Sequence, residues 1–167
     1  MNRFDDQRAW FCERVNENSG GLYWLGQSIL HNDEDVKDAV QEAVLTAYEK
    51  LDTLRDEHSF KPWIMRILAN TAYSMIRRSK PNTDIDSLAE ELPAPQNEDR
   101  EESMALWQAV RGLGESLRTV TVLFYYDDMP IKDISRALGI TEGTVKARLS
   151  RARAKLRIAM SEQEETL

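Results

Sequence analysis

The side chains best suited to chemistry in this sequence are cations, and they gather near its C-terminal end. Six of the ten lysines and arginines in residues 104–160 lie between Lys146 and Arg157. On a helix of about 100° per residue, the side opposite the apolar residues carries small side chains flanked by these cations. Small residues let a helix approach a major groove, and cations bind phosphates and guanine edges. The candidate DNA-reading residues are Thr144, Lys146, Ala147, Arg148, Ser150 and Arg151. A solvated helix face is the competing interpretation.

Two consecutive helical patterns would position these cations. Pro130 can open the first helix, and Gly139 suits a tight turn that needs a positive φ. Thr141 is placed to cap the second helix. The expected inward-facing residues are Ile131, Ile134, Leu138, Val145, Leu149, Ala152 and Leu156. Helix, glycine turn and helix of this length predict a helix-turn-helix, although helical hairpins of other proteins share the pattern.

A second candidate binding stripe lies on a long helix predicted to begin between Ser59 and Pro62. Its members are Trp63, Arg66, Asn70, Tyr73 and Arg77, spaced three or four residues apart. Aromatic rings can stack on unpaired bases, arginines can bind phosphates, and an amide can read a base edge. The competing interpretation is that the two aromatic rings pack against neighbouring helices and the arginines are only solvated.

A third candidate surface lies on a helix expected after Asn32, which can act as its N-cap. Three acidic residues follow this cap, where the helix dipole favours negative charge. The polar side of the helix carries Asp38, Gln41 and Glu42, with Leu45 among them. A leucine there indicates a surface for a partner protein, unless it is one of the single exposed leucines that are ordinary in folded proteins.

Composition excludes several classes of protein. The 167 residues are 31% charged and 41% hydrophobic, which predicts a folded protein rather than a disordered one. No apolar run approaches the roughly 20 residues of a membrane helix, and the first residues lack a signal peptide's apolar stretch, so we expect a cytoplasmic protein without membrane insertion. Cys12 is alone and is expected to be buried, while His31 and His58 form no zinc pattern.

No nucleophile and base pair, phosphate-binding loop or paired carboxylates occur at a convincing spacing. We therefore expect no catalytic residue, no metal site, no cofactor and no small-molecule substrate.

The chain divides by charge and by proline content. Residues 79–103 carry a net charge of −6 and three prolines, which predicts an acidic linker. Residues 1–78 and 104–160 should each form a small helical domain, and 161–167 an acidic tail. The predicted fold class is therefore all-α, with two small helical domains joined by a flexible linker.

Three motifs occur in a fixed order along the chain: DAVQE at 38–42, PWIMRILANTA at 62–72, and GTVKARLSRAR at 143–153. Together they resemble the extracytoplasmic-function (ECF) group of the sigma-70 family of bacterial RNA polymerase sigma factors. The resemblance implies a sigma region 2 domain at 1–78 and a sigma region 4 domain at 104–160. It also implies core RNA polymerase and promoter DNA as partners, and an anti-sigma factor as a further partner.

The resemblance assigns a role to each candidate surface. Asp38, Gln41, Glu42 and Leu45 fall where such factors meet the polymerase clamp, and the stripe from Trp63 to Arg77 falls where they capture the non-template strand of the minus-ten element. The cationic helix falls where they read the minus-thirty-five element, and the acidic linker resembles a segment that runs through the polymerase channels. The family's base-specifying loop would lie near residues 79–86.

The chain departs from many relatives in its basic run after the second motif, which contains only Arg77, Arg78 and Lys80, and in Ala43 and Val44, which replace a bulkier pair after the first motif. Two other functions stay open from the sequence. One is a stand-alone helix-turn-helix transcriptional regulator, which would bind duplex DNA as a dimer without polymerase. The other is a protein-interaction module, such as an anti-sigma or adaptor protein, whose basic helix contacts an acidic partner.

Overall fold

The computed structural model describes residues 3–79 and 100–165, and within these residues it contains helices and turns but no strand. The predicted all-α fold class is confirmed. The helices are α1 (Arg3–Glu17), α2 (Ser19–Ile29), α3 (Asp33–Glu49), α4 (Phe60–Ser79), α5 (Arg100–Arg111), α6 (Glu115–Thr121), α7 (Ile131–Leu138) and α8 (Glu142–Glu165). The short turns are the 3-10 helices η1 (Leu51–Thr53) and η2 (Glu57–Ser59) and a π-helical segment, η3 (Val122–Tyr126). No helix in the described ranges is both long and apolar enough to cross a membrane.

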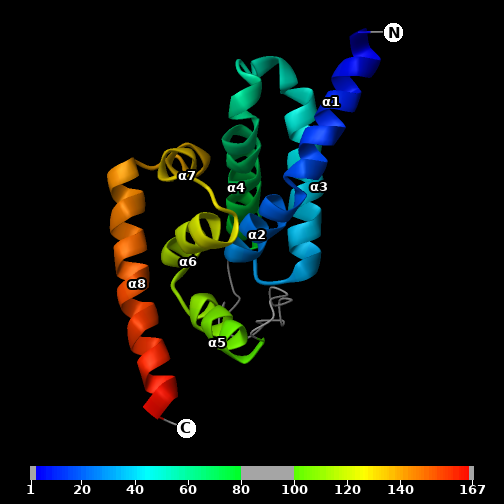
Figure 1. Cartoon of the computed structure of the whole chain (residues 1–167). Coiled ribbons are helices and arrows are strands. Elements are labelled where there is room, and N and C mark those ends of the chain that lie inside the picture. The colour runs from blue at the N-terminus through cyan, green and yellow to red at the C-terminus, as the bar shows by residue number, and fades with distance from the viewer. Residues whose placement is uncertain (1–2, 80–99, 166–167) are drawn as a thin grey trace.

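The N-terminal half is built around α3 and α4, which lie side by side (Figure 1). Asn32 caps α3 as predicted, because its Oδ1 accepts a hydrogen bond of 2.8 Å from the backbone N–H of Asp35. The buried face of α3 carries the small residues Ala39, Ala43 and Ala47. Small side chains let the two helix backbones approach closely, so α4 can place its own apolar residues in the core.

The C-terminal half contains the predicted helix-turn-helix, made by α7 and α8. Gly139 ends α7 with φ of 66°, the left-handed conformation that the glycine was expected to supply. Thr141 Oγ1 accepts a 3.1 Å hydrogen bond from the backbone N–H of Thr144, so the predicted cap of α8 is also confirmed. Val145, Leu149 and Ala152 are buried, as the inward stripe requires.

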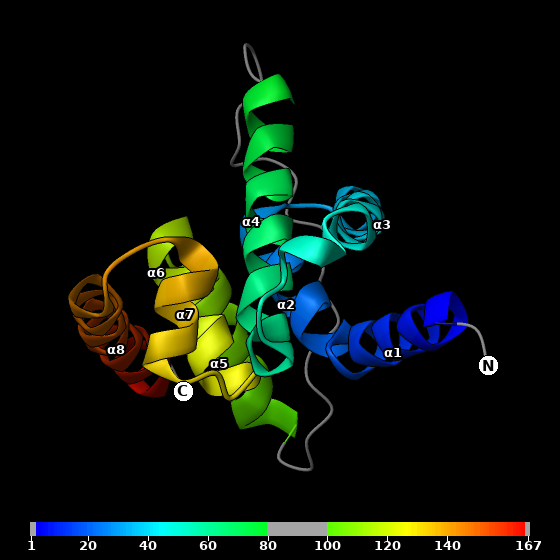
Figure 2. The same cartoon turned by 90° about the horizontal axis from the view of Figure 1, so that it is seen from above.

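The two halves pack directly against each other. A single hydrophobic cluster contains Leu25 and Leu68 from the N-terminal half together with Val120, Leu123 and Ile134 from the C-terminal half. Helix α4 contacts α7, and α2 contacts α6 and η3; Figure 2 shows α7 beside α4. The domains are therefore not separate bodies in this structure, an arrangement that the sequence did not indicate.

Three aromatic rings join the halves at a second place. The ring centroids of Trp24 on α2 and Trp107 on α5 lie 4.9 Å apart in an edge-to-face arrangement. Tyr126 at the end of η3 lies 5.3 Å from Trp24 and 5.1 Å from Trp107. Such edge-to-face pairs add stability beyond their area of burial.

The structure differs from one expectation, the burial of Cys12, and it extends two helices into the acidic segments. Cys12 is exposed rather than buried, because its neighbour Phe11 takes the inward direction on α1 and Cys12 points to solvent. Helix α5 begins at Arg100 and α8 continues to Glu165, so residues 100–103 and 161–165 are helical. Most of the predicted linker, and the predicted base-specifying loop beyond Ser79, lie outside the described residues.

Candidate nucleic-acid interface

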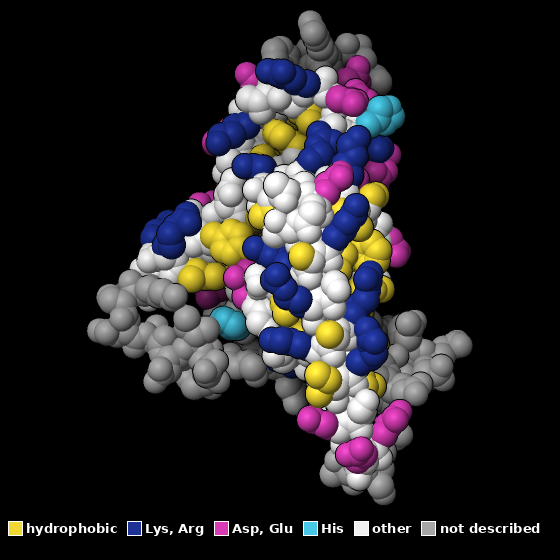
Figure 3. All heavy atoms as spheres, turned by 90° about the vertical axis from the view of Figure 1, so that its left-hand side faces the viewer, with side chains coloured by type: hydrophobic (Ala, Val, Ile, Leu, Met, Phe, Trp, Pro, Cys, Tyr) yellow, Lys and Arg dark blue, Asp and Glu magenta, His cyan; other side chains and the backbone are white. Residues whose placement is uncertain are grey.

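Helix α8 presents a cationic face on the side opposite its buried stripe. Lys146, Ser150 and Arg151 are exposed, whereas Thr144 and Ala147 are half-buried. Figure 3 shows lysine and arginine side chains gathered on this side of the molecule, with acidic side chains near the end of α8. A positive helix with small side chains between its cations matches the electrostatics and the shape of a major groove.

Two of the cations in α8 face other parts of the protein. Arg148 is half-buried and lies close enough to Tyr73 for its charge to act on that phenol. Arg153 donates a 2.6 Å hydrogen bond from Nε to the hydroxyl of Tyr125, and its guanidinium lies 5.7 Å from the centre of that ring. Fewer cations of α8 are therefore available to bind DNA than the sequence suggests.

The five residues of the predicted α4 stripe are divided among different surroundings. Trp63 is half-buried against the core, 5.8 Å from the ring of Phe60. Tyr73 is half-buried as well, so the packing interpretation holds for part of each aromatic side chain. Asn70 is exposed beside α3, and Arg77 is exposed at the end of the helix. The remaining residue, Arg66, is exposed but reaches towards the C-terminal half.

Two residues of this stripe bond to the C-terminal half. The hydroxyl of Tyr73 donates a 2.7 Å hydrogen bond to Glu115 Oε1 on α6. Burial, followed by this hydrogen bond, raises the pKa of the Tyr73 phenol well above its ordinary value, so the hydroxyl remains a donor. Arg66 Nη1 lies 3.4 Å from the carbonyl oxygen of Arg136, near the end of α7.

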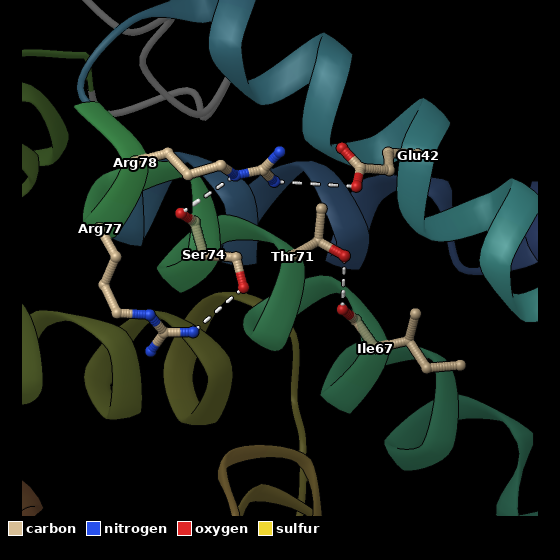
Figure 4. Close-up of polar contacts among 6 residues, drawn as sticks. All are labelled: Glu42, Ile67, Thr71, Ser74, Arg77 and Arg78. Atoms are coloured by element: carbon tan, nitrogen blue, oxygen red, sulfur yellow. Dashed lines mark hydrogen bonds and ion pairs between the residues drawn. The ribbon is translucent and has the colours of Figure 1, made fainter.

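A small polar groove lies between α3 and α4, with a volume of about 270 Å³. Asn70 lines it together with Thr71, Ser74 and Arg78 of α4 and Glu42 of α3. Figure 4 shows Arg78 beside Glu42, with 3.9 Å between Nη2 and Oε1. Because both side chains are largely exposed, this ion pair contributes little to stability and leaves both charges available to partners.

The third candidate surface is open along α3. Asp38, Gln41 and Glu42 are exposed, and the side chain of Leu45 is 66% exposed. Tyr48 lies one turn further on and is 46% exposed. The ring centroids of Tyr48 and Phe11 lie 5.2 Å apart in an edge-to-face arrangement, and the outer edge of the Tyr48 ring is in solvent.

Sequence reasoning did not find the C-terminal partners of α4. Glu115, Arg136 and Asp127 contact residues that lie 42 to 77 positions away in the chain. No local sequence motif indicates such contacts. The one feature of the sequence that could have suggested them is the presence of polar side chains on the partly apolar helix α4.

Comparison with known proteins agrees with this organisation. The protein-family model for Sigma-70 region 2 matches residues 15–81 of this chain. The protein-family model for Sigma-70, region 4 matches residues 103–156. RNA polymerase sigma factor SigV of Bacillus subtilis is 26% identical and covers 98% of this chain and 99% of its own. ECF RNA polymerase sigma factor SigW of the same organism is 31% identical over 91% of this chain and 89% of its own.

Solved structures share the fold over nearly the whole chain. The sigma factor RpoE of Bartonella quintana, in complex with the anti-sigma factor NepR, has a TM-score of 0.74 at 23% identity, covering 90% of this chain and 96% of its own. CnrH in complex with the cytosolic domain of CnrY has a TM-score of 0.68 at 25% identity, covering 93% and 90%. Two family models match this chain in the order of the motifs, and one relative is more than 30% identical over most of both chains. This chain therefore belongs to the ECF group of bacterial RNA polymerase sigma factors, which direct transcription initiation.

Proposed function

We propose that this sigma factor directs core RNA polymerase to promoters through three surfaces, each on one helix. Helix α8 holds the duplex of the minus-thirty-five element, α4 captures the non-template strand of the minus-ten element, and α3 binds the polymerase clamp. The observation that carries the proposal is the exposed face of α8, where Lys146, Ser150 and Arg151 lie opposite a fully buried stripe.

The minus-thirty-five surface is suited to duplex DNA. Thr144, Lys146, Ala147, Ser150 and Arg151 occupy the first half of α8, the part of a recognition helix that enters the groove. Cations there bind phosphates and guanine edges, and one good bidentate base contact discriminates against a wrong base by about 1–3 kcal/mol. Arg148 joins this surface when it is released from its position beside Tyr73.

The minus-ten surface is suited to unpaired bases. Stacking on an aromatic side chain contributes about 1–3 kcal/mol per base, which offsets part of the cost of opening the duplex. Trp63 and Tyr73 supply the rings, Arg66 and Arg77 supply cations for phosphates, and Asn70 supplies an amide. The groove beside Asn70 adds a place where polar atoms of α3 and α4 face the same strand.

The polymerase surface on α3 consists of Asp38, Gln41, Glu42 and Leu45. An exposed leucine surrounded by polar side chains resembles the anchor and rim of a protein interface. We place the protein in the cytoplasm with its polymerase, without catalysis of its own. The anti-sigma factor NepR that accompanies RpoE of Bartonella quintana supports a partner of the same kind here.

A run-off transcription assay tests the proposal. Core polymerase, this chain and a promoter library should give specific start sites, and omission of the chain should abolish them. Lys146→Ala and Arg151→Ala should reduce promoter use while leaving polymerase binding intact. Arg8→Ala, which removes an exposed cation on α1, is the matched control and should have no effect. Specific initiation without this chain, or binding of duplex promoter as a dimer without polymerase, would favour a stand-alone regulator.

A further inference from the structure

We propose that the groove between α5, η3 and the C-terminal part of α8 is a binding site for a small amphipathic anion, a molecule with an apolar body and one anionic group. Helix α5 lies beside α8 there (Figure 1), and the groove has a volume of about 870 Å³. Small-molecule sites have volumes of this order and are mostly apolar with a few polar groups. The proposal goes beyond the proposed function, because such a ligand would bind without polymerase or DNA.

The walls of the groove suit the apolar body of such a ligand. Large apolar and aromatic side chains line it: Trp24 of α2, Leu106 of α5, Tyr125 and Tyr126 of η3, and Leu156 and Met160 of α8. Leu106 is 40% exposed and Tyr125 is 49% exposed, so apolar surface meets water here. Removal of this surface from water favours binding of an apolar body, and the rings can pack against an aromatic one.

Two arginines give the groove a preference for negative charge. Arg153 and Arg157 lie one turn apart on α8, and both line the groove. Nε of Arg153 donates to the Tyr125 hydroxyl, which holds this side chain against the ring while its Nη groups remain donors. Among the described residues, no carboxylate pairs with the guanidinium of Arg157. A guanidinium binds a carboxylate through two parallel hydrogen bonds, so these side chains favour an anionic group over a neutral or cationic one.

One acidic side chain, that of Glu164, also lines the groove. It follows Arg157 by seven residues, which is about 10 Å along the helix axis at 1.5 Å per residue. At that separation, salt largely screens the repulsion between Glu164 and an anion bound at the arginines. Glu164 therefore restricts the anionic group to the arginine end of the groove without preventing binding.

One wall of the groove lies outside the part of the chain that matches region 4. The match to the Sigma-70, region 4 model ends at residue 156, whereas α8 continues to Glu165. Arg157, Met160, Ser161 and Glu164 all belong to this helical extension and line the groove. Without the extension, the groove would lack its second arginine and part of its apolar wall. The site is therefore a property of this chain's own C-terminal helix.

Fluorescence titration of the full chain with 1-anilinonaphthalene-8-sulfonate tests the site. This probe has an aromatic body and one sulfonate, and its emission increases on apolar surfaces. We expect saturable binding at one site per chain, and displacement of the probe by dodecanoate. Dodecyltrimethylammonium has the same chain length and a positive charge, so it should displace the probe at least tenfold less effectively.

Substitutions on α8 locate the bound probe. Arg157→Gln should weaken its binding at least fivefold, and Met160→Glu, which places a carboxylate on the apolar wall, should abolish saturable binding. Lys155→Gln removes an exposed cation of the same helix that does not line the groove, and this matched control should bind as wild type does. Glu164→Gln should bind at least as tightly as wild type. Circular dichroism and the thermal midpoint check that each variant is folded.

Several results would overturn the proposal. Absence of saturable binding would do so, and equal weakening in Arg157→Gln and Lys155→Gln would show a non-specific attraction to cations. Equal displacement by dodecanoate and dodecyltrimethylammonium would show that the groove does not select anions. Displacement by core polymerase but not by dodecanoate would assign the groove to a protein partner, and a dimer that Met160→Glu dissociates would assign it to a second copy. The titration contains no promoter DNA, so failure of the proposed function would leave its result unchanged.

Discussion

The hydroxyl of Tyr73 on α4 donates a 2.7 Å hydrogen bond to Glu115 Oε1 in the first turn of α6, across 42 residues of sequence. Burial raises the pKa of this phenol, so it stays protonated and cannot be repelled by the carboxylate under ordinary conditions. One of the two rings proposed to stack on promoter bases is thereby engaged by the half of the protein that reads duplex DNA.

Removal of this carboxylate should favour strand capture. Glu115→Ala deletes the acceptor and the negative charge beside Tyr73, and a hydrogen bond of this kind contributes on the order of 1 kcal/mol net. We therefore expect the free chain to bind a single-stranded minus-ten oligonucleotide several-fold more tightly, as measured by fluorescence anisotropy. Glu57→Ala, an exposed carboxylate on η2, is the control and should bind as wild type does. Weaker binding by Glu115→Ala would contradict the prediction.

The exposed cations of α8 should control the salt dependence of promoter binding. Affinity for DNA decreases as salt increases, and the plot of log affinity against log salt becomes less steep by about 0.9 for each cation that no longer binds a phosphate. Lys146→Ala should therefore weaken holoenzyme binding to a duplex minus-thirty-five probe and reduce the slope by about this amount. Lys50→Ala, exposed at the end of α3, should leave the slope unchanged, and an equal reduction in both variants would indicate a non-specific effect of charge.

Leu45 should act as an anchor for polymerase without stabilising the fold. Its side chain is 66% exposed, so Leu45→Ala removes little packing within the chain. An anchor at the centre of an interface contributes more than about 1 kcal/mol, equivalent to several-fold in affinity. A pull-down titration with core polymerase should show this weaker affinity while the thermal midpoint stays unchanged. Lys37→Ala on the same helix, which loses only an exposed ion pair with Asp33, should bind polymerase normally.

Gly139 should be sensitive to substitution for two separable reasons. Its φ of 66° is unfavourable for a residue with a Cβ, and that atom would also meet the guanidinium of Arg66. Gly139→Ala should lower the free energy of unfolding by about 1–2 kcal/mol through backbone strain alone. Gly139→Asn should cost less strain, because asparagine tolerates the left-handed region. Urea denaturation of each variant, with and without Arg66→Ala, separates the strain from the steric contact.

Asp127 should make stability depend on pH in the direction opposite to most carboxylates. Burial raises its pKa above the ordinary value of 3.8, and the charge of Lys61 only partly offsets this. The folded state therefore binds a proton more readily than the unfolded state does. The contribution of Asp127 to stability should rise as pH falls through the raised pKa towards 3.8, and should be lost at higher pH. Comparing unfolding of wild type and Asp127→Asn over this interval checks the sign.

Much of the local structure could be predicted from the types and spacing of neighbouring residues. The cap at Asn32, the turn at Gly139 and the cap at Thr141 each depend on a residue and its immediate neighbours, and all three were predicted correctly. The exposure of Leu45 and of Lys146 followed from helical periodicity in the same way. The burial of Cys12 was predicted wrongly, because the frequency with which unpaired cysteines are interior says nothing of which side of α1 meets the core.

The sequence by itself determined the caps at Asn32 and Thr141, the turn at Gly139 and the helix faces that could bind DNA or protein, because these depend on residues within one or two turns of each other. Only the tertiary structure decided that α7 lies on α4, that Tyr73 meets Glu115, and that Arg148 turns inward. These pairings join residues far apart in the chain, and their energy comes from shared burial and complementary polar groups. The helical periodicity of the sequence does not reveal these pairings. The packing of the two halves against each other was therefore evident only from the three-dimensional structure.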